Sequence, residues 1–232
     1  MLWMKRIQAI VIVAIVASLL ALVIVPMTGA FTEKRFFLVL FDDEIAINSE
    51  PVLKGYYQPL FQKDKKLEYL FLTSQGNSML YEQISKEEPQ LLSTDDFSGY
   101  VIIQTGSVWT QRAQALIEAR QESELVNLRE EYLVYMSNLL DSWQDKDRKI
   151  LIGDLFNPLP PRTKAANQLD KWLQQTNEQL YKMAYDKGVL VAPVYESLRR
   201  SKYDEVFVEG KLNVTGREQV ENALIKVLRI TN

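Results

Sequence analysis

The sequence predicts an α/β fold in which a parallel β-sheet has helices on both faces, preceded by one N-terminal transmembrane helix. Short, continuously apolar runs alternate along the chain with longer stretches whose apolar residues recur at helical spacing. Strands that are apolar throughout, rather than at every second position, are typical of a parallel sheet that is buried on both faces.

Five segments are predicted to be strands, and each is a short apolar run that ends at a turn: residues 36–41, 67–72, 100–104, 149–153 and 188–192. Helices are predicted between and after them, over residues 52–62, 78–85, 110–143, 164–186 and 216–227. Residues 155–161 are expected to form a loop, because their three prolines break either kind of element.

Ligands of such sheets bind at the carboxyl ends of the strands, near the point where the strand order reverses. The segments that follow the predicted strands are therefore the places to look for a site. They are residues 42–47, 74–78, 106–109, 156–161 and 206–216.

The first 30 residues predict a membrane anchor. Residues 7–25 consist almost wholly of Ile, Val, Ala and Leu, a length that spans most of a hydrocarbon layer of about 30 Å. Secretory signal peptides have a shorter apolar stretch of roughly 7–15 residues. We therefore expect residues 1–30 to form an uncleaved signal-anchor and residues 31–232 to form one domain. Cleavage after the small residues at positions 28–30 is the alternative.

Lys5 and Arg6 precede the apolar run and favour a cytoplasmic N-terminus. The predicted protein crosses the cell membrane once and places its C-terminal domain outside the cytoplasm. The net charge of the whole chain is -3, and an acidic domain has no electrostatic attraction to an anionic lipid surface. The same acidity argues against nucleic acid as a partner, since binding phosphate backbones requires a basic face.

The chain of 232 residues contains no His and no Cys. These absences exclude Ser-His-Asp and Cys-His catalysis, disulfide bonds, and zinc sites built from imidazole or thiolate ligands. We expect no metal and no cofactor. Asp42, Asp43 and Glu44 could offer oxygens to a hard cation, but the run lacks the glycine and ligand number of a calcium loop.

The segments after the strands resemble, in order and spacing, the conserved blocks of the SGNH/GDSL hydrolases, which are extracytoplasmic esterases and lipases with a flavodoxin-like sheet. The first block, Leu40 to Ala46, keeps the family Asp at Asp43 but has Glu44 in place of the nucleophilic Ser. The second block keeps its oxyanion glycine as Gly76, and the third keeps Gly106 but has Val108 in place of the oxyanion Asn.

The last two blocks show the same pattern. Asn157 and Pro158 match the turn after the fourth strand of the family. Asn213 and Gly216 match the scaffold of the final block, in which Val208 replaces the Asp of the triad and Lys211 replaces the His. The resemblance predicts that four positions meet at one cleft: Glu44, Gly76, Val108 and Lys211.

These departures imply that the family's ester hydrolysis is lost, because one missing oxyanion donor alone costs about 3 kcal/mol of transition-state stabilisation. We expect a catalytically inactive binding or scaffold module at the envelope of a bacterial cell, with an envelope protein or polysaccharide as its partner. A hydrolase of altered mechanism, using Glu44 and Lys211, is one alternative, and an unrelated flavodoxin-like receptor domain is another. The candidate binding residues are Asp42, Asp43, Trp109 and Asn157.

Overall fold

The computed structural model describes residues 35–41, 67–73, 98–144 and 148–231, and all of them belong to one unit of the chain, residues 35–232. The predicted N-terminal membrane segment and the predicted helices over residues 52–62 and 78–85 lie outside the described residues. No helix within the described ranges is both long enough and apolar enough to cross a membrane.

The predicted parallel sheet is confirmed, and its strands lie on the continuously apolar runs. The strand order is β2-β1-β3-β4-β5, with every neighbouring pair parallel. The chain therefore steps outward from β1 to β2 and then crosses to β3 on the other side of β1, which makes the carboxyl ends of β1 and β3 the switch point. The strands are β1 (Arg35–Phe41), β2 (Leu67–Thr73), β3 (Ser98–Gln104), β4 (Arg148–Gly153) and β5 (Leu190–Ala192).

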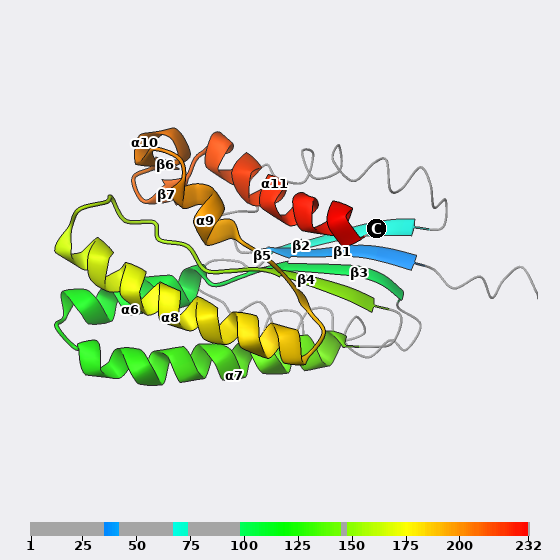
Figure 1. The fold of residues 1–232 in the computed structure, drawn as a ribbon, viewed down its shortest axis with the longest axis horizontal. Helices are drawn as coiled ribbons and strands as arrows, with labels where there is room; N and C mark the ends of the chain where they lie inside the picture. Colours follow the sequence, from blue (N-terminus) through cyan, green and yellow to red (C-terminus); the bar gives the residue numbers. More distant parts are fainter. Residues whose placement is uncertain (1–34, 42–66, 74–97, 145–147, 232) are drawn as a thin grey trace, which may run out of the picture. The chain divides into compact units, whose positions relative to one another are not determined.

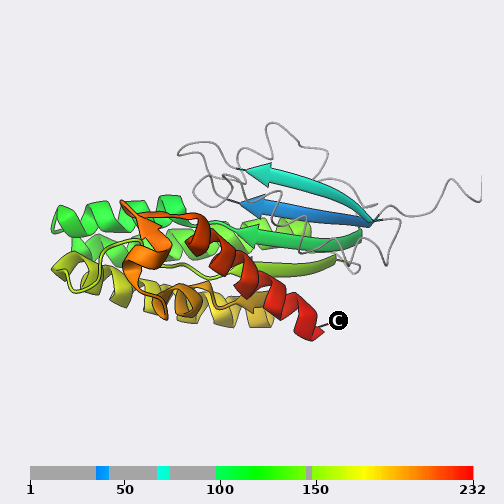
Figure 2. The same cartoon turned by 90° about the horizontal axis from the view of Figure 1, so that it is seen from above.

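Helices pack on both faces of the sheet (Figure 1). Alternate residues of β3 point to opposite faces, so Val101 and Ile103 join one core and Ile102 joins the other. The first core is covered by α6 (Ser107–Glu118), α7 (Leu125–Trp143) and α8 (Lys164–Asp186). The second is covered by α9 (Val194–Arg199) and α11 (Val214–Thr231), as Figure 2 shows from above.

The prediction of one helical region over residues 110–143 is wrong in its continuity. Arg120 has a left-handed backbone (φ 59°) and ends α6, and a short 3-10 turn over Glu122–Glu124 precedes α7. The Arg120 N–H donates to the Ile117 carbonyl (3.1 Å), and the Gln121 N–H donates to that of Leu116 (2.8 Å). A helix end with these two hydrogen bonds usually has glycine at the left-handed position. Here that position is Arg120, so no glycine in the sequence marks the break.

Both ends of α8 follow ordinary sequence rules, and its observed range is the predicted one. The Thr163 hydroxyl accepts a hydrogen bond from the Ala166 N–H (3.0 Å) and caps the first turn. Gly188, at φ 68°, ends the helix in the left-handed conformation that glycine adopts without strain.

A small hairpin near the C-terminus is absent from the sequence prediction. After α10 (Tyr203–Val206), strands β6 (Phe207–Val208) and β7 (Lys211–Leu212) pair antiparallel, with Val208 opposite Lys211. The two turn residues, Glu209 and Gly210, both have positive φ (51° and 78°), as a tight two-residue hairpin requires.

Candidate functional site

A groove of about 450 Å³ lies at the carboxyl ends of β3 and β4, the edge at which the sequence analysis expects a site. The residues after β3 and the polar face of α6 form one wall. The loop after β4, together with Tyr203 of α10, forms the apolar floor. Glu209 and Gly210 of the hairpin turn, together with Lys211 of β7, close one side.

Helix α6 turns its polar side chains to the groove and its apolar side chains to the core. Ser107, Gln111 and Gln114 recur every three or four residues and line the groove. Trp109 and Ala113 lie on the buried face of the same helix. The wall therefore offers uncharged hydroxyl and amide groups.

Trp109, a candidate binding residue, does not line the groove, which corrects that prediction. Its side chain is 4% exposed and packs against the rings of Tyr132 and Tyr135, with centroid distances of 5.7 and 5.6 Å. The Arg112 guanidinium lies 4.8 Å from its ring centroid. The helical period, which places Trp109 on the face opposite Gln111 and Gln114, decides this position.

Gly106 is required where the ends of β3 and β4 approach each other. It precedes α6 with φ 144°, and a Cβ added at this residue would lie 2.0 Å from the Leu155 Cδ2. Leu155 is itself held to α8, since its N–H and carbonyl both bond the side-chain amide of Asn177 (2.9 and 2.8 Å). The glycine matched to the family's third block therefore has a packing role here.

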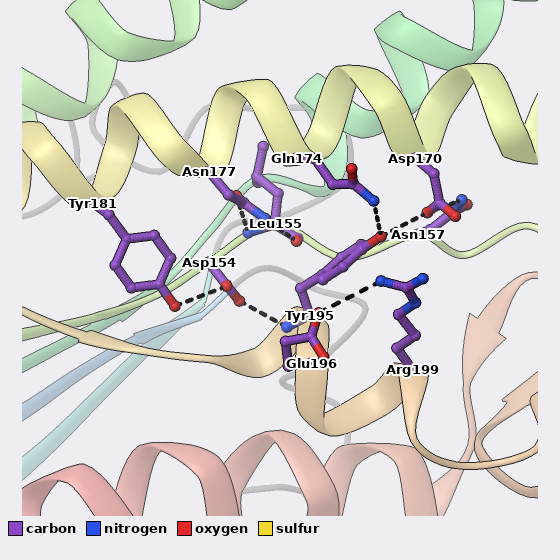
Figure 3. Close-up of polar contacts among 10 residues, drawn as sticks. All are labelled: Asp154, Leu155, Asn157, Asp170, Gln174, Asn177, Tyr181, Tyr195, Glu196 and Arg199. Carbon is purple, nitrogen blue, oxygen red and sulfur yellow. Dashed lines mark hydrogen bonds and ion pairs between the residues drawn. The ribbon is translucent and has the colours of Figure 1, made fainter.

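Asn157, a candidate binding residue, faces α8 and not the groove (Figure 3). Its Nδ2 donates to the Ala166 carbonyl (3.0 Å) and to the Asp170 Oδ1 (2.8 Å), and its Oδ1 accepts from the Leu159 N–H (2.9 Å). These bonds fix the loop that forms the groove floor.

Lys211, which the sequence resemblance sets in place of the family's His, is among the residues that line the groove. Two residues further along the chain, Asn213 caps the first turn of α11: the Asn213 Oδ1 accepts a hydrogen bond from the Gly216 N–H (2.9 Å). A Cβ on Gly216 would lie 2.2 Å from the Val206 carbonyl oxygen, so only glycine fits there. The two matched residues of the final block thus hold the hairpin that carries Lys211.

The remaining predicted site residues are placed differently. Val108 is half-buried and does not line the groove. Four others lie outside the described residues: Asp42, Asp43, Glu44 and Gly76. Within the described ranges, no group of three or more acidic side chains is placed to hold a metal ion.

Gln104 is a groove residue that the sequence analysis does not single out. Its side chain is 2% exposed, and its Nε2 donates to the Asp154 carbonyl at 3.5 Å, while its Oε1 has no hydrogen-bond partner among the described residues. Gly153 makes room for it, because a Cβ there would lie 1.5 Å from the Oε1. A polar residue at the end of an otherwise apolar strand is the signal that could have identified it.

Asp154, which the sequence analysis also missed, carries a carboxyl group buried between Tyr181 of α8 and Tyr195 of α9 (Figure 3). It is 3% exposed and accepts hydrogen bonds from the Tyr195 N–H (2.7 Å) and the Tyr181 hydroxyl (3.1 Å). Burial raises the pKa of Asp154 to about 7, although these hydrogen bonds oppose the shift. Burial and the neighbouring Asp154 also raise the pKa of Tyr181. The carboxyl group joins the end of β4 to the first turn of α9.

The fold is that of the SGNH/GDSL hydrolases, so the resemblance holds at the level of the fold. A protein described as a GDSL-like lipase, from Parabacteroides merdae, has a TM-score of 0.60 and 8% identity, over 85% of this chain and 97% of its own. One described as an SGNH hydrolase, from Slackia heliotrinireducens, has a TM-score of 0.51 and 15% identity, over 85% and 100%.

A catalytic mutant of an acetylxylan esterase from Geobacillus stearothermophilus has a TM-score of 0.56 and 11% identity, over 84% of this chain and 94% of its own. No protein-family model matches the sequence, and no curated protein matches it. At these identities the likeness concerns the fold, and activity has to be argued from the site.

Proposed function

We propose that the chain is a membrane-anchored, extracytoplasmic module of SGNH-like fold that binds a ligand or partner at the cell envelope and does not hydrolyse esters. One observation carries the proposal. A groove lies at the sheet edge where such folds bind ligands, it is lined by Lys211, which the sequence resemblance sets in place of the family's His, and the chain contains no His at all.

The groove supports binding better than catalysis. Ser107 and Thr110 place hydroxyl groups at it, but a hydroxyl nucleophile needs an adjacent base to lose its proton. The family's imidazole base is absent, and Lys211 and Glu209 are the charged side chains among the lining residues. Hydroxyl and amide side chains lie over an apolar floor, and the opposite charges of Glu209 and Lys211 stand at one side of the groove. This lining suits a chain that carries no net charge and is rich in hydroxyl or amide groups. A structural neighbour is an acetylxylan esterase, so by analogy of fold we favour an envelope polysaccharide or protein as the ligand.

Ester hydrolysis is the direct test. We expect the full chain, in a mild detergent, to hydrolyse 4-nitrophenyl acetate and naphthyl acetate no faster than buffer does. The alternative hydrolase predicts turnover that is lost in both Glu44→Ala and Lys211→Ala. Lys202→Ala is the matched control, because Lys202 is exposed and does not line the groove. Turnover with that pattern would overturn the proposal in favour of an enzyme.

The binding function is tested by photo-crosslinking in intact cells. A photoreactive residue at Gln111, on the groove wall, should capture an envelope component, whereas the same residue at Val134 should not. Val134 is 61% exposed on α7, which does not line the groove. Equal capture at both positions would contradict a specific role for the groove.

A further inference from the structure

A second cavity, of about 160 Å³, lies behind the floor of the groove, between the loop after β4, α8 and α9. Phe156, Leu159 and Tyr203 line both spaces, so they form a common wall. Lys211 does not line the second cavity. The second cavity is therefore distinct from the place at which the family resemblance expects the site.

One side of this cavity is aromatic. The Phe207 ring stacks on that of Tyr203 at 5.1 Å and lies 6.1 Å from that of Phe156, and Tyr195 adds a fourth ring to the lining. A dry cavity of about 150 Å³ is known to hold benzene in another protein. The cavity as a whole thus has the volume for one aromatic ring, and its aromatic side offers the apolar surface for it.

The other side carries two guanidinium groups. Arg162 has a left-handed backbone (φ 70°) and no ion-pair or hydrogen-bond partner among the described residues. Arg199 lies 3.6 Å from the Glu196 carboxylate, but both side chains are more than half exposed, so this pair is weak. Both arginines are therefore available to a ligand.

The cavity is also lined by the carboxylate of Asp170, whose negative charge opposes the positive charges of the two arginines. The Asp170 Oδ1 accepts hydrogen bonds from the Asn157 Nδ2 (2.8 Å) and the Tyr195 hydroxyl (3.2 Å), so two donors of the protein already stabilise it (Figure 3). With two cations against one anion, the charged lining residues favour a negatively charged ligand.

We propose that this cavity binds a small monocarboxylate with a flat apolar body of about the size of benzoate. The carboxylate faces Arg162 and Arg199, whose planar guanidinium groups match its geometry. The ring lies against Phe156 and Phe207. An occupant would contact the groove floor from behind.

The experiment titrates the full chain, in a mild detergent, with three fluorinated probes observed by ¹⁹F NMR. We expect 4-fluorobenzoate to bind with a Kd of about 1 mM and the neutral 4-fluorobenzamide to bind about tenfold more weakly. Absence of 4-fluorobenzoate binding at several times that concentration would overturn the proposal. So would equal binding of the amide, or tighter binding of the cationic 4-fluorobenzylamine, which would mean that Asp170 dominates.

Variants locate the site. The double substitution Arg162→Gln and Arg199→Gln should weaken 4-fluorobenzoate binding about tenfold without loss of folding, since both side chains are exposed. Arg200→Gln is the matched control, because Arg200 is the exposed neighbour of Arg199 and does not line the cavity. Lys211→Ala should leave binding unchanged. If it abolished binding instead, the carboxylate would lie in the groove and the proposal would be wrong.

Discussion

At the scale of single residues, the positions that match the SGNH/GDSL blocks are of two kinds. Some have a role that depends on backbone geometry, and others have a role that depends on the chemistry of the side chain. Gly106 is needed because its φ of 144° is one that other residues rarely adopt, and Gly216 because a Cβ would collide with the Val206 carbonyl. Lys211 stands on the groove where the resemblance expects His. The two glycines therefore match for reasons of backbone geometry, whereas the side chain presented to the groove differs from the one that the resemblance expects.

Asp154 makes the stability of the fold dependent on pH. Its pKa is raised from 3.8 to about 7 in the folded chain, so folding binds a proton between these values. The stabilising contribution of Asp154 is fully present below pH 4 and is lost as the pH rises to about 7. The free energy of unfolding should fall by about 4 kcal/mol over this range. We expect Asp154→Asn, whose amide resembles the protonated carboxyl group, to match the parent at pH 4 and to exceed its free energy of unfolding at pH 8.

The measurement is urea denaturation followed by tryptophan fluorescence across this pH range, with Asp186→Asn as the control. Asp186 is exposed at the end of α8, so its substitution should leave the pH profile of the parent unchanged. A profile for Asp154→Asn that is parallel to the parent's would show that the buried carboxyl group does not titrate in this range.

At the scale of elements, helix ends were predictable where a residue type marks them. Thr163 and Gly188 delimit α8, and the apolar spacing between them is helical. The end of α6 was not predictable, because Arg120 adopts a left-handed backbone conformation and arginine is not a residue that indicates one. The hairpin over Phe207–Leu212 was missed because strands of two residues leave no periodicity to detect.

The hydrogen bond by which Thr163 caps α8 should make a measurable contribution to the free energy of unfolding. Thr163→Ala removes the hydroxyl that accepts from the Ala166 N–H, so we expect the free energy of unfolding to fall by about 1 kcal/mol. Thr163→Ser keeps the hydroxyl and should keep most of that stability. Equal losses in the two variants, measured by urea denaturation, would show that the cap hydrogen bond is not the cause.

At the scale of the whole molecule, the predicted topology is the property most open to a direct test. Lys5 and Arg6 before the apolar run favour a cytoplasmic N-terminus. We therefore expect alkaline phosphatase fused after Asn232 to be active in bacterial cells, and green fluorescent protein at the same position to be dark. The opposite pair of results would place the C-terminal domain in the cytoplasm.

The sequence by itself determined the class of fold and a large part of the chemistry that is excluded. Continuously apolar runs indicate strands buried on both faces, and the absence of His and Cys excludes imidazole and thiol catalysis in any conformation. These conclusions depend on composition and local pattern, which the chain carries without reference to its packing.

Only the tertiary structure decided which side chains share a space. It places Trp109 in the core and Gln104 at the groove, brings Arg162 near Arg199 across 36 intervening residues, and buries Asp154. The physical reason is that a side chain's surroundings depend on the helical face or strand end it occupies and on the segment packed against it. The segment packed against a side chain is not set by its neighbours in sequence.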